Sequence, residues 1–207
     1  MDPVFEKKYH AVEEDYYWFR ARRDIILRLL SDLPRELRVV DIGCSGGALM
    51  GDLSRQGFRD VVGIDISKEA ISECHRRGYS SAIVADAQRL PFPDDTFDLL
   101  IASDILEHMD DEDATLREWW RVLKTGGRAL VFVPAHMYLW SSHDAVNHHR
   151  KRYSKSEFRH VLSNNRFELT RTGYWNLSLF VPAVIVRTFN KFAIFNKRVK
   201  QKDNLYS

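Results

Sequence analysis

The chain has 207 residues, of which 44% are hydrophobic and 29% are charged, with a formal net charge of +2 at pH 7. This length and apolar content suffice for one domain with one core. The near balance of charge gives no global field that would attract nucleic acid. Cys44 and Cys74 have neither metal-ligand nor disulfide-framework spacing. No signal peptide opens the chain, so we expect a cytoplasmic protein.

Short apolar runs alternate with amphipathic segments, which predicts an α/β fold, a doubly wound parallel sheet with helices on both faces. Helices are expected over residues 10–32, 47–57, 68–77, 111–123 and 155–163. Strands are expected over residues 37–42, 60–64, 81–85, 97–103, 127–133 and 166–173. Ser154 and Glu157 predict a capping box at the start of the last helix.

The most informative segment is an apolar strand that runs into a glycine-rich turn, residues 39–47 with the sequence VVDIGCSGG. A second apolar strand follows over residues 60–64, and Asp65 stands at its tip. A carboxylate about 20 residues beyond a glycine-rich strand–helix turn is placed to accept hydrogen bonds from a ribose. These segments therefore predict a nucleotide-type cofactor site at the first crossover of the sheet.

The spacing of the glycines indicates which cofactor binds. The dinucleotide fingerprint requires G-x-G-x-x-G, whereas here Ser45 stands at the second glycine position, between Gly43 and the pair Gly46 and Gly47. Asp41 would repel a pyrophosphate at close range, but it suits a cofactor that carries an ammonium group. The pattern D-x-G-x-x-G-G resembles motif I of the class I S-adenosylmethionine (SAM)-dependent methyltransferases of the small-molecule type, similar to methyltransferase domain 11.

The resemblance continues in the order of that family and covers about residues 37–175. It includes the third strand tip, the segment that feeds the fourth strand, the LEH motif and the helix and turn before the fifth strand, at residues 83–87, 90–103, 106–108 and 116–127. Thr125 replaces the usual proline of that last turn. The resemblance implies a Rossmann-like sheet of the seven-stranded type, with SAM as cofactor and S-adenosylhomocysteine as product.

The resemblance also implies a role for individual residues around SAM. The glycine turn would hold the methionine part, the second strand tip the ribose, the third strand tip the adenine, and the end of the fourth strand the reacting methyl. In that order, the residues are Asp41, Gly43, Cys44, Ser45 and Gly46; Asp65; Ile66, Asp86 and Ala87; Ser103 and His108. Within the first group, Cys44 is interpreted as serving through its small size.

The N-terminal segment is dense in aromatic and arginine residues and resembles a leader of a bacterial branch of these enzymes, where it covers the cofactor. Trp18 and Arg22 are accordingly candidates for cofactor contact, and Arg22 or Arg23 could pair with the carboxylate of SAM. The alternative is structural, because aromatic side chains on a helix usually anchor it to a core and arginines usually lie on its solvated face.

Two histidines are candidate catalytic residues at the rim formed by the loops after strands four and five. We expect His143, next to Asp144, to be the general base, with His108 as the second candidate. No metal is expected, because adjacent histidines such as His148 and His149 rarely converge on one ion with a third such as His143. The basic residues 149–153 could close over the substrate pocket and attract an anionic group, or merely solvate a loop.

The chain divides into an N-terminal helical cap over the cofactor site at residues 1–35, a SAM-binding domain at residues 36–175 and an apolar, basic extension at residues 176–207. No convincing last antiparallel strand follows, so we expect either that the chain is truncated before it, which we favour, or that the tail takes another course. Arg187 and Lys191 interrupt the apolar stretch, which is too short to span a bilayer. The extension could lie on a membrane surface, pack on the domain or form a homodimer interface.

The predicted function is transfer of a methyl group from SAM to a small-molecule acceptor or to a glycan- or lipid-linked acceptor, with O-methylation favoured. The alternative is a SAM-binding protein without turnover that acts as a partner or regulator. An NAD or nucleotide-sugar enzyme is disfavoured by Asp41 and by the glycine spacing. Nucleic acid is not expected as a partner, since no further basic surface accompanies residues 149–153.

Overall fold

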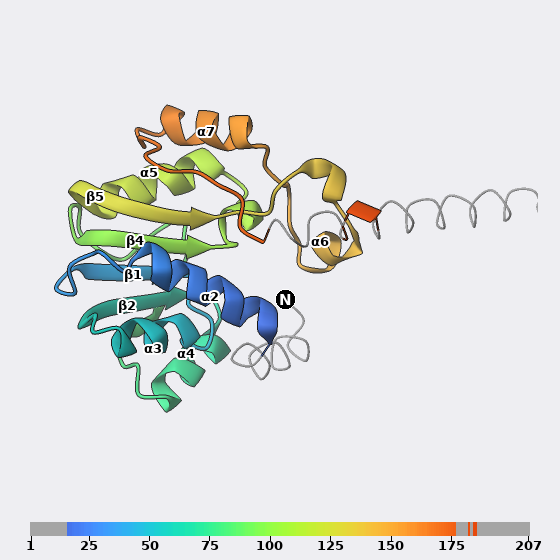
Figure 1. The fold of residues 1–207 in the computed structure, drawn as a ribbon. Coiled ribbons are helices and arrows are strands. Elements are labelled where there is room, and N and C mark those ends of the chain that lie inside the picture. Colours follow the sequence, from blue (N-terminus) through green and yellow to red (C-terminus); the bar gives the residue numbers. More distant parts are fainter. Residues whose placement is uncertain (1–15, 177–181, 183, 186–207) are drawn as a thin grey trace, which may run out of the picture.

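The computed structural model describes residues 16–176, 182, 184 and 185. Its parallel sheet has the strand order β3-β2-β1-β4-β5 (Figure 1). The strands are β1 (Arg38–Ile42), β2 (Asp60–Asp65), β3 (Ala82–Val84), β4 (Phe97–Ser103) and β5 (Leu123–Phe132). The strand order reverses between β1 and β4, so their carboxyl ends form the switch point at which doubly wound sheets bind ligands.

The helices are α2 (Tyr17–Leu29), α3 (Ala48–Arg55), α4 (Lys68–Arg76), α5 (Glu112–Val122), α6 (Ser142–Val146) and α7 (Lys155–Asn164), with 3-10 turns η1 (Leu106–His108) and η2 (Met137–Leu139). The predicted α/β class and the first five strands are confirmed, as are four of the helices. The expected helix over residues 10–32 is α2, and residues 10–15 lie outside the described residues. The sequence did not predict α6 or the two 3-10 turns.

The side chains of successive residues in the central strands point to opposite faces of the sheet and pack in different cores, because helices cover both faces. Val40 and Leu100 belong to the core that α5 and α7 cover, whereas Val39 and Leu99 belong to the core under α2 and α3. These strand residues are at most 1% exposed. Figure 1 shows α5 and α7 on the same side of the sheet. The continuous apolar runs of the sequence are therefore explained by burial on both sides.

Trp119 anchors α5 in the larger core and also fixes the loop after β3. Its side chain is fully buried, and its Nε1 donates a hydrogen bond of 3.0 Å to the carbonyl oxygen of Ala87. We expect Trp119→Phe to lower the free energy of unfolding by about 1–3 kcal/mol, because the Ala87 carbonyl would lose its partner. Trp120→Phe, at the neighbouring position that is 43% exposed, should change it by about 0.5 kcal/mol. Urea denaturation of both variants measures the difference, and equal losses would contradict the assignment.

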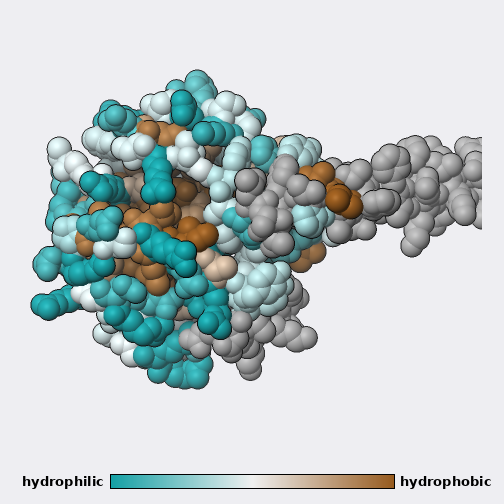
Figure 2. All heavy atoms as spheres, in the orientation of Figure 1, coloured by the Kyte–Doolittle hydropathy of each residue, from teal (hydrophilic) through white to brown (hydrophobic). Residues whose placement is uncertain are grey.

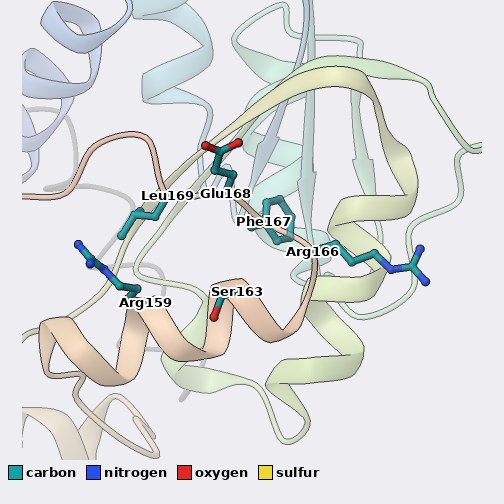
Figure 3. Close-up of a pocket in the computed structure, with 6 residues that line it drawn as sticks. All are labelled: Arg159, Ser163, Arg166, Phe167, Glu168 and Leu169. Atoms are coloured by element: carbon teal, nitrogen blue, oxygen red, sulfur yellow. The ribbon is translucent and has the colours of Figure 1, made fainter.

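The strand expected over residues 166–173 is wrong, since this segment is irregular and pairs with no strand in the described part of the chain. Phe167 and Leu169 pack instead against the core that α5 and α7 cover. Packing thus partly buries the alternating apolar residues without a sheet partner. The segment and α7 line an open pocket of about 490 Å³ (Figure 3), which the cofactor motifs do not reach.

β5 is therefore an edge strand within the described residues. Residues 129–133 are only half-buried, and Figure 2 shows apolar surface, in brown, over β4 and β5 on the face in view. Among the described residues, no helix combines the length and apolar character needed to cross a membrane. The predicted contacts of the C-terminal extension, and any seventh strand, fall almost entirely outside the described residues. The proposed division into three segments stays a prediction.

Candidate active site

The glycine turn after β1 is fixed by β2 and by the segment that follows β4. The backbone N–H groups of Gly43 and Cys44 donate to the carbonyl oxygen of Ile64 at 2.8 and 2.9 Å. Gly43 has a φ of +75°, and a Cβ at this position would overlap the side chain of Ile105. Glycine is therefore required both for the left-handed backbone and for the close approach of the two loops.

Gly43 can be tested against a glycine that has the same backbone conformation but open space around it. Gly126 has a φ of +79°, and no atom lies within 4 Å of the place that a Cβ would take there. We expect Gly126→Ala to cost about 1–2 kcal/mol of unfolding free energy from backbone strain alone. Gly43→Ala should cost about 2–4 kcal/mol, because overlap with Ile105 is added to the strain. Thermal denaturation provides the comparison, and a larger loss for Gly126→Ala would contradict it.

Asp65 is oriented at the tip of β2 by two backbone hydrogen bonds. Its Oδ2 accepts from the N–H of Ser45 at 3.0 Å, and its Oδ1 accepts from the N–H of Ser67 at 2.9 Å. Ser45 has a φ of +49°, so the carboxylate holds the turn in an unusual conformation. The next residue, Ile66, is 73% exposed. An oriented carboxylate beside an exposed apolar side chain fits the predicted ribose and adenine positions.

The tip of β3 lies beside that of β2. The N–H of Ala85 donates to the carbonyl oxygen of Asp65 at 3.0 Å, which joins the two loops. Asp86 is exposed, and its Oδ1 accepts from the N–H of Gln88 at 2.9 Å. Ala87 is held through its carbonyl by the buried tryptophan of α5. The residues predicted to frame adenine therefore lie at the same edge of the sheet as Asp65, the carboxylate predicted to bind the ribose.

The remaining predicted cofactor residues lie at the ends of β1 and β4. Asp41 is 3% exposed, Gly46 is buried, and the hydroxyl oxygen of Ser103 is buried without a hydrogen bond among the described residues. The Cys44 thiol has a raised pKa because of its hydrogen bond with Cys74 and its burial. Cys44 is thus a protonated packing residue, and its predicted contact with the cofactor stays a prediction.

Arg22 and Trp18 attach α2 to this part of the molecule. Arg22 forms an ion pair with Asp104, the residue that follows β4. The ring of Trp18 packs on that of Trp175, with the centroids 4.8 Å apart. Both contacts are within the protein, as the structural alternative expects. A direct role of either residue toward SAM stays a prediction.

The loop after β5 folds back over η1. The N–H of His136 donates to the carbonyl oxygen of Tyr153, and the N–H of Tyr153 donates to that of Pro134, both at 2.9 Å. The N–H of Arg150 donates to the carbonyl oxygen of Glu107 at 2.8 Å. The two ends of this loop are therefore hydrogen-bonded to each other. Residues near its C-terminal end also contact the segment that follows β4.

Asp144 organises this loop from a fully buried position in α6. Its Oδ1 lies 3.0 Å from Nδ1 of His149 and accepts from Nε of Arg152 at 2.7 Å, while its Oδ2 accepts from the N–H of Ser141 at 2.8 Å. Burial raises the pKa of the Asp144 carboxyl, but the hydrogen bonds from Arg152 and Ser141 outweigh it and lower the pKa overall. The ionised carboxylate orients His149, not the adjacent His143.

The predicted catalytic histidines occupy different environments. His143 is exposed, its Nε2 lies 3.0 Å from Nδ2 of Asn147, and its ring centroid is 6.4 Å from that of His149. His108 is half-buried and meets His149 edge to face, with the centroids 4.8 Å apart. His148 is exposed on the loop. His149 therefore stands between the two predicted residues, and the assignment of His143 as general base stays a prediction.

Glu107 is the residue that sequence reasoning missed. It is 1% exposed, and neither carboxylate oxygen has a hydrogen-bond partner among the described residues. Burial raises the pKa of Glu107 to about 8. Burial, with His149 and His148 nearby, lowers the pKa of His108 to about 4, and burial lowers the pKa of His149 despite Asp144. We call Glu107, His108 and His149 the Glu107 cluster.

The basic residues of the loop form ion pairs with acidic residues of the same chain. Arg150 pairs with Asp110, Lys151 with Glu112, and Arg152 with Asp144. The capping box predicted for Ser154 and Glu157 is confirmed at the start of α7. These pairs support a structural role for the loop's charges and leave the predicted attraction of an anionic group a prediction.

Comparisons with known proteins agree with this geometry. Residues 40–131 match the family described as "Methyltransferase domain". The 2-methyl-6-phytyl-1,4-hydroquinone methyltransferase 2 of Oryza sativa subsp. japonica is 30% identical over 138 residues, which are 65% of this chain and 40% of the relative. The ubiquinone/menaquinone biosynthesis C-methyltransferase UbiE of Vibrio parahaemolyticus is 31% identical over 151 residues, 61% of this chain and 58% of the relative.

Among solved structures, the YcgJ protein of Bacillus subtilis superimposes with a TM-score of 0.66 at 26% identity, over 76% of this chain and 73% of that one. The sheet, the glycine turn and the acidic residues at the strand tips are typical of SAM-dependent, Rossmann-like methyltransferases. The match over residues 40–131, the relatives and the fold together support a class I SAM-dependent methyltransferase, a class whose cofactor is SAM. It spans only 40% and 58% of the lengths of the two curated relatives.

Proposed function

We propose that this protein transfers the methyl group of SAM to a hydroxyl oxygen of a small-molecule acceptor. The observation that carries the proposal is the Glu107 cluster. Glu107 and His108 lie in η1, shortly after β4 at the switch point, and His149 comes from the loop after β5. Ile105, next to the cluster in sequence, contacts the glycine turn. The cofactor residues and these proton-binding side chains therefore belong to one continuous edge of the sheet.

A hydroxyl acceptor makes a specific demand on the protein. Bound SAM supplies a methyl group whose bond to a positively charged sulfur breaks, with the electron pair left on sulfur, as the acceptor oxygen attacks. The acceptor's proton must also leave, which calls for a group that accepts or stabilises it. The imidazoles of His108 and His149 are suited to this task, and the Glu107 side chain lies beside them.

A second candidate is methylation of a ring carbon. The two relatives are named for a hydroquinone acceptor and for C-methyl transfer. In this chain, the His136 ring stacks between Tyr138 and Tyr174, with centroids 5.1 and 5.2 Å away, and both tyrosines are about half exposed. Such a flat surface suits an aromatic acceptor.

Transfer of an isotope-labelled methyl group tests the proposal. The purified chain is incubated with methyl-¹³C SAM and with free phenols, prenylated hydroquinones and glycan- or lipid-linked alcohols. Lipid-linked acceptors are included because we also propose that residues 176–207 contact a membrane surface. We expect ¹³C NMR to show an O-methyl product. A C-methyl product would support the second candidate, and SAM binding without a product from any acceptor would favour the non-enzymatic partner or regulator.

A further inference from the structure

The Glu107 cluster has the composition of a metal site. Glu107, His108 and His149 each offer one ligand atom, and these atoms lie within 4.8 Å of one another. Two imidazoles and one carboxylate form a common donor set for transition metals. This set differs from the three histidines that sequence analysis considered and rejected as a metal site, because the fold brings His149 to η1 and leaves His143 and His148 exposed.

Glu107 itself points to a missing ligand. A carboxylate that is 1% exposed, with both oxygens lacking a hydrogen bond among the described residues, is costly to bury. The nearby arginines do not remove this cost, because Arg22 is paired with Asp104 and Arg152 with Asp144. A bound cation would satisfy the carboxylate and compensate its charge.

His149 is also oriented as metal ligands usually are. Metal-binding histidines typically donate their second ring nitrogen to a carboxylate or a backbone carbonyl, which fixes the tautomer and the ring. Nδ1 of His149 lies 3.0 Å from the buried carboxylate of Asp144, which leaves Nε2 as the ligand atom. The ring of His108 packs edge to face on that of His149, with the centroids 4.8 Å apart.

We propose that Glu107, His108 and His149 bind one divalent transition-metal ion, with Zn²⁺ preferred over Mg²⁺. Mg²⁺ favours oxygen ligands in an octahedral arrangement, whereas two imidazoles and a carboxylate suit Zn²⁺. Ligand atoms of a tetrahedral zinc site lie about 3.4 Å apart, given bonds of about 2.0–2.1 Å. Binding therefore draws the ligand atoms together by up to about 1.4 Å relative to the 4.8 Å limit.

Three protein ligands leave a coordination position open. With the ion bound, its three ligands would no longer accept the acceptor's proton. An acceptor hydroxyl oxygen on the ion would instead become more acidic and would release its proton to water before it attacks the methyl group. This use of the ion rests on the proposed function, whereas binding of the ion does not. Metal content and methyl transfer are therefore measured separately.

Zinc titration of the chelator-treated, full-length chain tests the site. We expect one Zn²⁺ to bind per chain, with Mg²⁺ failing to displace it. Glu107→Gln and His149→Ala should each weaken binding at least about 100-fold, and Asp144→Asn should weaken it about 10- to 100-fold through loss of ligand orientation. His160→Ala removes an exposed histidine on α7 and serves as the matched control. Circular dichroism confirms that each variant is folded.

Co²⁺ gives a second, spectroscopic readout of the same ligands. We expect visible absorption bands of bound Co²⁺ that disappear in Glu107→Gln and persist in His160→Ala. Absence of zinc binding, or equal affinity in the wild type and in folded Glu107→Gln, would overturn the proposal even if labelled methyl transfer were observed. Zinc binding with the expected losses would support the metal site even if no acceptor were methylated.

Discussion

Asp65→Ala is expected to weaken SAM binding by about 100-fold or more. Two charge-assisted hydrogen bonds to a ribose contribute about 1.5–3 kcal/mol each, and the alanine would lose both. The same change removes the acceptor that fixes the backbone of Ser45 in the glycine turn. The cofactor would therefore meet both a missing partner and a less ordered turn. Isothermal titration of the wild type and the variant with SAM measures the effect.

Asp60 provides the matched control for this experiment. It lies at the other end of β2, is exposed, and pairs with Arg38 at 3.4 Å. Asp60→Ala should leave SAM affinity within about twofold of the wild type, because exposed ion pairs contribute little. Similar losses of SAM affinity in both variants would show that Asp65 acts only through general stability. Binding of NAD with an affinity similar to that of SAM would argue against the cofactor assignment.

Asp144→Ala is expected to lower the free energy of unfolding by about 3–5 kcal/mol, because it leaves a buried cation without its partner. The Asp144 side chain is fully buried and that of Arg152 is only 9% exposed. The variant would also release His149 from its orienting carboxylate. Urea denaturation followed by circular dichroism gives the unfolding free energy, and limited proteolysis shows whether the loop over η1 opens first.

Asp94 provides the control that separates the effect of burial from the effect of losing an ion pair. Asp94 pairs with Arg121 at 2.7 Å, but its side chain is 72% exposed. Asp94→Ala should therefore cost less than about 1 kcal/mol. If the two aspartate variants lost the same stability, burial of the Asp144–Arg152 pair would not be the source of the larger effect.

The cofactor edge could be predicted from sequence because its signals are local. Gly43 and Asp65 each follow an apolar run, and the carboxyl ends of parallel strands meet at one edge of the sheet. The order of motifs along the chain then indicated the class of fold. The same locality explains why four helices and the first five strands were placed within a few residues of their observed bounds.

The acceptor side could not be predicted in the same way, because its contacts join distant segments. Asp144 orients His149 through a turn of the loop, whereas adjacency in sequence favoured His143. Burial of Glu107 depends on the loop after β5. The sequence of η1 itself does not indicate that this distant loop will cover it. The apolar alternation at residues 167–169 predicted a strand, but these side chains are instead partly buried by packing against a neighbouring core.

The structure of the protein crystallised with S-adenosylhomocysteine tests the central claim most directly, namely that the carboxyl edge between β1 and β4 binds the cofactor. We expect the ribose hydroxyls within hydrogen-bond distance of Asp65, the adenine against Ile66 and Asp86, and the sulfur near Ser103. Density for the ligand elsewhere, for example in the pocket between α7 and residues 166–169, would contradict the account.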